Sequence, residues 1–193
     1  MRSFSLAVAL LGSIMVCRSS AFATPLAGGA IHRLTQASAS ARGRCRQRLA
    51  AYNEPTMGFK SPLDVLKQGI ARAGAGPYDK EAVKKTVSDY TSGSKVVVFS
   101  WTRCPFCKKA KSLVEDLVED QSQYEFVELD EREDGNAIRY ELSQMTGRTS
   151  VPQIWIGGEF VGGCNDGPGI FTLRDQGELS PMLEAAGCTL KSN

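Results

Sequence analysis

The chain has 193 residues, of which 42% are hydrophobic and 23% charged, and its formal net charge is +2. This length allows one globular domain with extensions and excludes a large multidomain enzyme. The charge is uneven, because the first 53 residues contain seven arginines and no Asp or Glu, which leaves the remainder net acidic. The charge therefore argues against a basic nucleic-acid-binding body, and we expect no nucleic-acid partner.

The only histidine, His32, lies in this basic leader. Without imidazole in the body, Cys-His and Ser-His hydrolases and His-ligated metal sites are excluded there. The chemistry of the body is therefore expected to depend on cysteine.

The leader has the composition of a targeting sequence in two parts. Arg2 and the apolar run Leu6–Val16 are typical of a secretory signal peptide, because the run is shorter than the roughly 20 residues that span a bilayer. We expect a signal peptide over residues 1–21 and a transit-peptide-like leader, rich in Arg, Ala and Ser, over residues 22–53. Ser20–Pro25 resembles the junction in the bipartite presequences of algae with secondary plastids. The resemblance implies import into the plastid stroma, with no membrane association after processing; a secreted protein with a basic propeptide is the alternative.

Residues 54–78 are expected to be a connector that contains one short helix, followed by a domain over residues 79–193. Ser61-Pro62 favours a helix start, and the small residues of 71–76 favour its end. The sequence does not indicate whether this helix packs on the domain or acts as a spacer. The apolar residues that recur at helical spacing and predict an amphipathic helix are Leu63, Leu66 and Ile70.

The first half of the domain predicts two strands and two helices. Asp79 can cap a helix that runs to about Tyr90, and Lys95–Ser100 contains a continuous apolar run typical of a buried central strand. A Cys-x-x-Cys pair follows at once and opens a helix, for which Lys108–Glu119 has helical spacing. Tyr124–Asp130 alternates as a second strand.

The second half predicts a helix over Asp134–Thr146, with Ile138, Leu142 and Met145 facing inward and Gly147 at its end. Two further strands and two further helices follow. The order of elements predicts an α/β fold with a mixed sheet and helices on both faces. The expected hairpin is Gln153–Ile156 and Glu159–Val161 around a Gly157-Gly158 turn, and the expected helices are 167–176 and 179–186.

Removal of the leader leaves four cysteines: Cys104, Cys107, Cys164 and Cys188. In a secreted domain they suggest two disulfides, whereas in a reducing compartment one Cys-x-x-Cys suggests redox catalysis. A four-cysteine zinc site needs a second close pair, and Cys164 and Cys188 do not form one.

Cys104 is placed where a strand ends and a helix begins. Backbone N–H groups and the positive end of the helix dipole favour its thiolate there, and Arg103 and Lys108 add positive charge. Pro105 is tolerated in the first helical turn because no N–H donor is needed. Cys107 lies one turn further on the same side, so Cys104 is expected to attack a disulfide and Cys107 to resolve the product.

Three motifs together resemble those of a glutaredoxin, over roughly Tyr78–Gly187. They are Cys104-Pro105-Phe106-Cys107 after a strand, Ser150-Val151-Pro152 before the hairpin, and Gly162-Gly163-Cys164-Asn165-Asp166 after it. The resemblance implies a thioredoxin fold with a four-stranded mixed sheet, and glutathione-dependent reduction of protein–glutathione mixed disulfides and other disulfides. Thioredoxin itself has Trp directly before the first Cys and Gly-Pro between the pair, unlike Arg103 and Pro105-Phe106 here.

The resemblance also implies a glutathione site. Pro152 is expected to be cis, which would turn the Val151 backbone towards Cys104 so that the glutathione cysteinyl group pairs with it. A helix N-terminus at Cys164–Asp166 would bind the γ-glutamyl group, and Arg139 the glycyl carboxylate. The residues so implied for glutathione are Arg103, Cys104, Phe106, Arg139, Ser150, Val151, Pro152, Gly163, Cys164, Asn165 and Asp166.

Two residues depart from the family pattern. Trp101 stands where the family usually has Lys, so one carboxylate contact is lost unless Arg103 or Lys95 replaces it, and Phe106 replaces the commoner Tyr. Cys164 is interpreted either as a small buried residue or as a redox-responsive third thiol. Cys188 is expected to be idle.

A binding module is the second hypothesis: a 2Fe–2S cluster held between two chains, each contributing Cys104 and one glutathione. Cluster-binding relatives tend to have a small flexible residue at the position of Pro105, so the rigid Pro is evidence against the cluster hypothesis. We therefore expect no metal and a monomer, with glutathione and glutathionylated or disulfide-containing proteins as partners.

Overall fold

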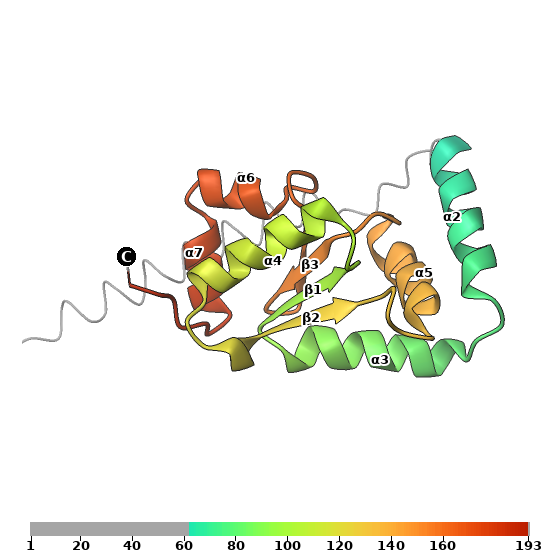
Figure 1. The fold of residues 1–193 in the computed structure, drawn as a ribbon, viewed down its shortest axis with the longest axis horizontal. Coiled ribbons are helices and arrows are strands. Elements are labelled where there is room, and N and C mark those ends of the chain that lie inside the picture. The colour runs from blue at the N-terminus through green and yellow to red at the C-terminus, as the bar shows by residue number, and fades with distance from the viewer. Residues whose placement is uncertain (1–61, 193) are drawn as a thin grey trace, which may run out of the picture.

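A four-stranded mixed sheet lies between two layers of helices in the computed structural model, which describes residues 62–192 (Figure 1). The strand order is β2-β1-β3-β4. β1 (Val96–Ser100) pairs in parallel with β2 (Tyr124–Glu128) and antiparallel with β3 (Gln153–Ile156), and β4 (Glu159–Gly162) pairs antiparallel with β3. The predicted α/β architecture with a mixed sheet is confirmed. The predicted leader segments, 1–21 and 22–53, lie outside the described residues.

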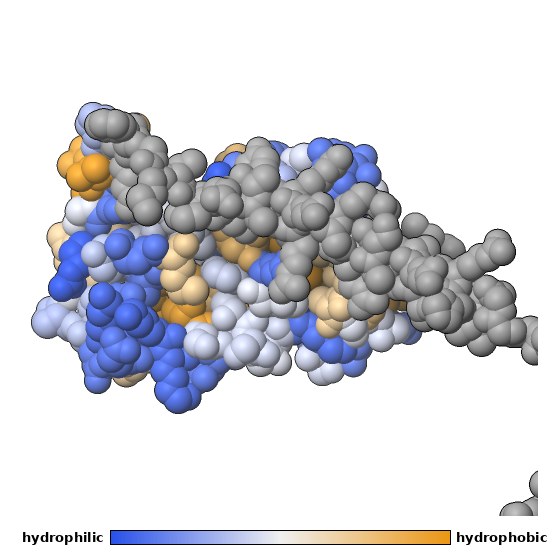
Figure 2. Space-filling view, turned by 180° about the vertical axis from the view of Figure 1, so that it is seen from behind, coloured by the Kyte–Doolittle hydropathy of each residue, from blue (hydrophilic) through white to orange (hydrophobic). Residues whose placement is uncertain are grey.

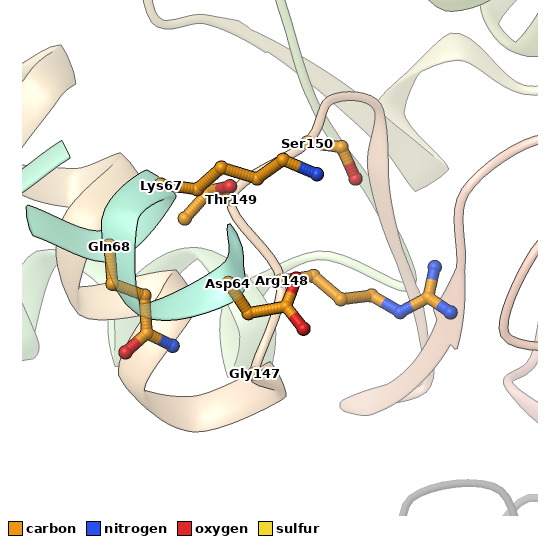
Figure 3. A pocket seen from close by; sticks show the side chains of 7 residues that line it. All are labelled: Asp64, Lys67, Gln68, Gly147, Arg148, Thr149 and Ser150. Atoms are coloured by element: carbon orange, nitrogen blue, oxygen red, sulfur yellow. The ribbon is translucent and has the colours of Figure 1, made fainter. Parts of the chain in front are cut away.

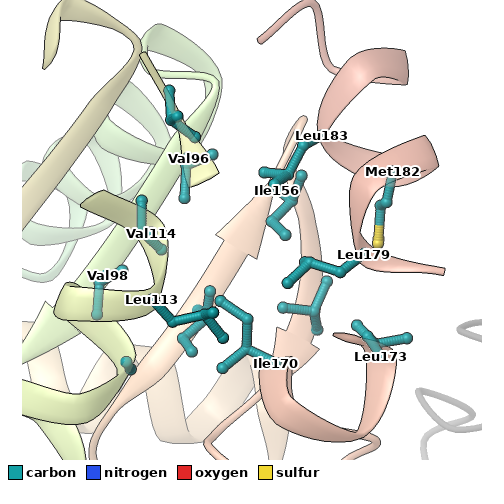
Figure 4. Packing of buried hydrophobic residues seen from close by; sticks show 14 of the residues in the cluster. Val96, Val98, Leu113, Val114, Ile156, Ile170, Leu173, Leu179, Met182 and Leu183 are labelled. Carbon is teal, nitrogen blue, oxygen red and sulfur yellow. The ribbon is translucent and has the colours of Figure 1, made fainter. Parts of the chain in front are cut away.

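β1 is the central strand, and all five of its residues are buried, as its continuous apolar run predicts. Because successive side chains point to opposite faces, the strand contributes to two hydrophobic clusters. Val96 and Val98 belong to the cluster shown in Figure 4, and Val97 and Phe99 belong to the cluster on the other face. The strand that carries the Cys-x-x-Cys pair at its end is thus anchored on both sides.

Two helices cover one face of the sheet. α3 (Lys80–Gly93) is capped by Asp79, whose side chain accepts the N–H groups of Glu81 and Ala82, and α5 (Gly135–Thr146) ends at Gly147 with a φ of 72°. The opposite face is covered by α4 (Pro105–Leu117), α6 (Ile170–Asp175) and α7 (Leu179–Ala185). A short 3-10 helix, η1 (Gln121–Gln123), precedes β2.

The predicted hairpin between β3 and β4 is confirmed. Its turn residues Gly157 and Gly158 have φ values of 58° and 80°, a region that side chains with a Cβ rarely adopt. The turn therefore needs the two glycines that the sequence supplies.

Three local expectations were wrong. α4 ends at Leu117 rather than Glu119, and Val118 instead forms a β-bridge with Leu190. α6 begins at Ile170 rather than Gly167, because Gly167 and Gly169 have positive φ values that a right-handed helix does not allow. Met145 is 57% exposed rather than inward, and the buried face of α5 contains Glu141 instead.

The connector contains α2 (Pro62–Ala75), which packs against α5. Ala71 is buried at this contact, and the Arg72 guanidinium lies over the rings of Tyr78 and Tyr140, 5.3 and 5.5 Å from their centroids. The predicted apolar stripe does not make the contact, because Leu63, Leu66 and Ile70 are each more than half exposed. Figure 2 shows hydrophobic surface at this end of the molecule. The helix is thus docked through its small and cationic side chains.

Glu141 is a buried carboxylate next to this contact. Its Oε1 accepts a hydrogen bond of 2.5 Å from the Tyr78 hydroxyl, and only 2% of the residue is exposed. Burial, and then this hydrogen bond, raise the pKa of Tyr78 to about 12. The tyrosine therefore remains a donor across the ordinary pH range.

We expect Tyr78→Phe to lower the free energy of unfolding by about 2 kcal/mol, because it removes the donor to a buried charged group. Urea denaturation measures the change. Tyr140→Phe is the matched control, since its ring also lies beside Arg72 but its hydroxyl makes no hydrogen bond within residues 62–192. Equal losses in the two variants would contradict a role for the Tyr78 hydroxyl.

Candidate active site

Cys104 and Cys107 stand at the start of α4, as predicted. Cys104 is the N-cap, and its Sγ accepts the Cys107 backbone N–H at 3.3 Å. Pro105 occupies the first helical turn, where its missing N–H leaves no bond unmade. The Cys104 sulfur thus accepts an N–H group that has no partner within the helix, at the positive end of the helix dipole.

The two sulfurs differ in accessibility. Cys104 is partly exposed, whereas Cys107 is fully buried. Burial, followed by its contact with Cys104, raises the pKa of Cys107 to about 12. Cys107 therefore keeps its proton at neutral pH, and Cys104 is the sulfur that a disulfide in solvent can reach.

The turn before Cys104 is fixed to the end of β2. The Cys104 N–H donates to the Trp101 carbonyl oxygen at 3.1 Å. The Thr102 hydroxyl donates to Asp130 at 2.6 Å, and its backbone N–H donates to the same carboxylate at 3.0 Å. These hydrogen bonds hold the pKa of Asp130 below its ordinary value. The turn before Cys104 is therefore held by contacts outside its own helix.

The Ser150-Val151-Pro152 segment lies beside Cys104. The Val151–Pro152 peptide bond is cis, as predicted, and the Val151 carbonyl oxygen is 4.0 Å from the Cys104 Sγ. Pro152 is buried and Ser150 is exposed. A thiol ligand joined to Cys104 would thus have the Val151 backbone next to it.

The segment after β4 is a tight loop rather than the start of a helix, so the expected helix N-terminus at Cys164–Asp166 is wrong. Gly162 has a φ of 103°, and the Gly163 N–H donates to the Asp166 carbonyl oxygen at 2.8 Å. A Cβ on Gly163 would lie 2.5 Å from Asp166 Oδ1 and 3.3 Å from the Pro152 carbonyl oxygen. The loop therefore closes on itself and on the Pro152 segment, with Asn165 and Asp166 exposed.

Asp166 has a partner that the sequence did not indicate. Its carboxylate forms an ion pair with Arg148, which is 18 residues away in the chain. An ion pair between residues so far apart leaves no local pattern in the sequence from which it could be predicted. The predicted ligand-binding carboxylate is therefore already bound to a cation of the chain itself.

Cys164 connects this loop to the Cys-x-x-Cys turn. It is buried, and its Sγ donates to the Phe106 carbonyl oxygen at 3.1 Å. Burial raises the pKa of Cys164 to about 11, and burial also raises the pKa of Cys188. Both stay protonated at neutral pH. Phe106, two residues after Cys104, is 55% exposed.

Arg139 on α5 reaches the same region. Its Nε donates to the Thr149 carbonyl oxygen at 2.8 Å, and its guanidinium lies over the Trp101 ring, with Cζ 4.7 Å from the centroid. Burial lowers the pKa of Arg139 from its ordinary value. Lys95, by contrast, donates to the Gly187 carbonyl oxygen near the other end of β1, so it cannot replace the missing lysine. Arg103 is exposed next to Cys104.

A polar cavity of about 250 Å³ lies between α2 and the loop that joins α5 to β3 (Figure 3). In Figure 3 the Lys67 side chain extends towards Ser150, while Arg148 points away from α2. No local pattern in the sequence indicates this cavity, because its two walls are far apart in the chain. Its lining residues are Asp64, Lys67, Gln68, Gly147, Arg148, Thr149 and Ser150.

Among residues 62–192 no group of three or more His, Cys, Asp or Glu side chains is placed to hold a metal ion. No helix in that part of the chain is both long and apolar enough to cross a bilayer. The four cysteines described there are free thiols.

Comparisons with known proteins agree with this geometry. A family model described as Glutaredoxin matches residues 96–161. Glutaredoxin-C4 of Arabidopsis thaliana is 42% identical over 118 residues, which are 61% of this chain and 79% of that protein. Glutaredoxin-C4, chloroplastic, of Oryza sativa subsp. japonica is 38% identical over 99 residues, 51% of this chain and 70% of that protein. The crystal structure of a buckwheat glutaredoxin–glutathione complex aligns with a TM-score of 0.51 at 36% identity, covering 57% of this chain and 97% of that chain.

Proposed function

Since the chain belongs to the glutaredoxin family, we propose that it is a glutathione-dependent thiol–disulfide oxidoreductase that reduces protein–glutathione mixed disulfides and other disulfides. The observation that carries the proposal is the position of Cys104. Its Sγ is partly exposed at the head of α4, accepts the Cys107 N–H, and lies 4.0 Å from the Val151 carbonyl oxygen.

The proposed reaction uses the different accessibility of the two sulfurs, one partly exposed and one buried. The Cys104 thiolate attacks the glutathionyl sulfur of a mixed disulfide, and the substrate protein leaves as a thiolate that takes up a proton. A second glutathione thiolate then attacks the glutathionyl sulfur on Cys104, which releases oxidised glutathione and restores the Cys104 thiolate. With other disulfides, Cys107 attacks the Cys104 sulfur of the mixed disulfide and its proton passes to the leaving thiolate, so that both electrons come from the pair. Two glutathione molecules then reduce the Cys104–Cys107 disulfide.

Glutathione is proposed to lie across three segments that the fold brings together. Its cysteinyl backbone would pair with Val151 between Ser150 and Pro152, and its apolar contact would be Phe106. The γ-glutamyl group would lie at Gly163–Asp166, where Asp166 would exchange Arg148 for the ligand's ammonium group. Arg139 would bind the glycyl carboxylate, with Arg103 adding charge at the rim. The buckwheat glutaredoxin–glutathione complex, which shares this fold, supports glutathione as the ligand.

We further propose that the chain reaches a plastid through the signal peptide at 1–21 and the transit-peptide-like leader at 22–53. The composition of these segments supports the proposal, as does the chloroplastic designation of the rice relative. The connector at 54–78 and the domain at 79–193 would remain as the mature protein. We propose that this protein acts as a monomer on glutathionylated proteins.

Coupled reduction of hydroxyethyl disulfide, with glutathione, glutathione reductase and NADPH, tests the activity on residues 54–193. We expect NADPH consumption that depends on both the protein and glutathione. Turnover with a thioredoxin reductase but not with glutathione would contradict the proposal. Anaerobic reconstitution with iron and sulfide tests the cluster hypothesis, and a stable coloured dimer would contradict the assignment of an enzyme without metal.

A further inference from the structure

Trp101 connects the turn that carries Cys104 to a cation on α5. Its carbonyl oxygen accepts the Cys104 N–H at 3.1 Å, and its ring lies under the Arg139 guanidinium, with Cζ 4.7 Å from the centroid. Arg139 is held from a second side, because its Nε donates to the Thr149 carbonyl oxygen at 2.8 Å. Trp101 therefore contacts both the nucleophile's turn and the group that reaches the segment before Val151.

Arg139 has no anionic partner in the part of the chain that the structure describes. Its hydrogen bond uses Nε, and no carboxylate of residues 62–192 pairs with Nη1 or Nη2, although the side chain is half-buried. A guanidinium stays charged at neutral pH, and charged groups withdrawn from water are usually paired. The free Nη edge is therefore suited to an anionic group of a ligand.

The two contacts of Arg139 leave this edge open. The ring of Trp101 covers one face of the guanidinium, and the Thr149 carbonyl occupies the Nε side. Trp is the aromatic side chain that attracts a guanidinium most strongly. The two Nη donors that remain match the two oxygens of a carboxylate.

We propose that Trp101 is a positioning residue that holds Arg139 for the distal carboxylate of a peptide thiol whose sulfur is bound at Cys104. The inference rests on the proposed function and extends it to the residue that orients the carboxylate contact. The distance is suitable, because Thr149 is two residues from Val151, at most about 7.2 Å between Cα atoms. The carbonyl oxygen of Val151 is in turn 4.0 Å from the Cys104 Sγ. Trp101 carries no charge to pair with a carboxylate, and its ring contacts Arg139, so we assign its effect on the ligand to Arg139.

Steady-state kinetics of the full chain tests this assignment with two matched substrates. One substrate is a peptide joined by a disulfide to glutathione. The other is the same peptide joined by a disulfide to γ-glutamylcysteine, which has no glycine residue and therefore no glycyl carboxylate. Trp101→Leu and Trp101→Met both remove the aromatic ring but keep an apolar side chain, so the test needs only one of them to fold. Trp101→Phe is the rescue variant, because it restores an aromatic ring.

We expect Trp101→Leu to raise the KM for the glutathione substrate about tenfold, with kcat within about twofold of wild type. The KM for the γ-glutamylcysteine substrate should change less than about twofold, and Trp101→Phe should recover most of the loss. Arg139→Gln should give the same pattern, and the Trp101→Leu, Arg139→Gln double variant should be no worse than Arg139→Gln alone.

Three results would overturn the assignment: an unchanged KM in the Leu and Met variants, an equal rise in KM for both substrates, or additive effects in the double variant. An equal rise would mean that Trp101 only supports the turn. If the wild-type chain turns over neither substrate, the proposed function itself is wrong, and the assignment fails with it. Turnover by wild type with an unaffected Trp101 variant rejects only the positioning role.

Discussion

The Cys104→Ser variant is expected to lose turnover of glutathione mixed disulfides by more than about a thousandfold, because a hydroxyl at the head of α4 cannot replace the thiolate nucleophile. The structure leaves no substitute among the described cysteines. Cys107, Cys164 and Cys188 are buried, and burial raises the pKa of each thiol. The coupled assay with glutathione reductase measures the loss.

Cys107→Ser is the matched control, since it removes the second sulfur of the same turn. We expect it to keep most of the turnover of glutathione mixed disulfides, where a second glutathione regenerates Cys104, and to lose the reduction of disulfides that needs both thiols. Circular dichroism checks that both variants fold. Full activity in both variants would contradict the mechanism, as would a complete loss of deglutathionylation in Cys107→Ser alone.

Gly162→Ala is expected to have the largest effect on stability near the site. Gly162 has a φ of 103°, and a Cβ there would lie 2.1 Å from the Asp166 carbonyl oxygen, which is backbone and cannot simply rotate away. Backbone strain and overpacking together should lower the free energy of unfolding by about 3 kcal/mol. The displaced loop should also raise the KM for glutathione substrates.

Gly177→Ala separates the two causes. Gly177 has a φ of 70°, but nothing lies within 4 Å of the place where a Cβ would be. This variant therefore carries the cost of a positive φ without the clash, about 1 kcal/mol, and should leave the KM unchanged. If urea denaturation showed the same loss in both variants, the close approach of Asp166 to Gly162 would have no energetic weight.

The features that could be predicted from the sequence are those that a local pattern determines. The run from Val96 to Phe99 predicted a strand buried on both faces, and Gly157-Gly158 predicted a turn that needs positive φ. The Cys104 position followed in the same way, because a strand that ends at a Pro-containing helix start places a sulfur at the N-cap. The fold class follows from the order of such elements.

The parts that could not be predicted depend on contacts between distant segments. Met145 was expected to be buried from spacing alone, but the Tyr78 hydroxyl makes it possible to bury Glu141 on the same helix. The late start of α6 depends on Gly167 and Gly169, whose φ values a residue pattern does not reveal. The contact of Trp101 with Arg139 could not be predicted either, because Arg139 lies 38 positions further along the chain and such a contact leaves no local pattern.

If Asp166 binds the ammonium group of the ligand as proposed, the Arg148–Asp166 ion pair makes that binding an exchange rather than an addition. The Asp166 side chain is 56% exposed, so the internal pair contributes at most about 1 kcal/mol and is easily given up. A monocationic amine that binds Asp166 would leave the Arg148 guanidinium without a counter-ion. A zwitterion supplies both charges at once, so charge balance would favour it over the amine at this loop.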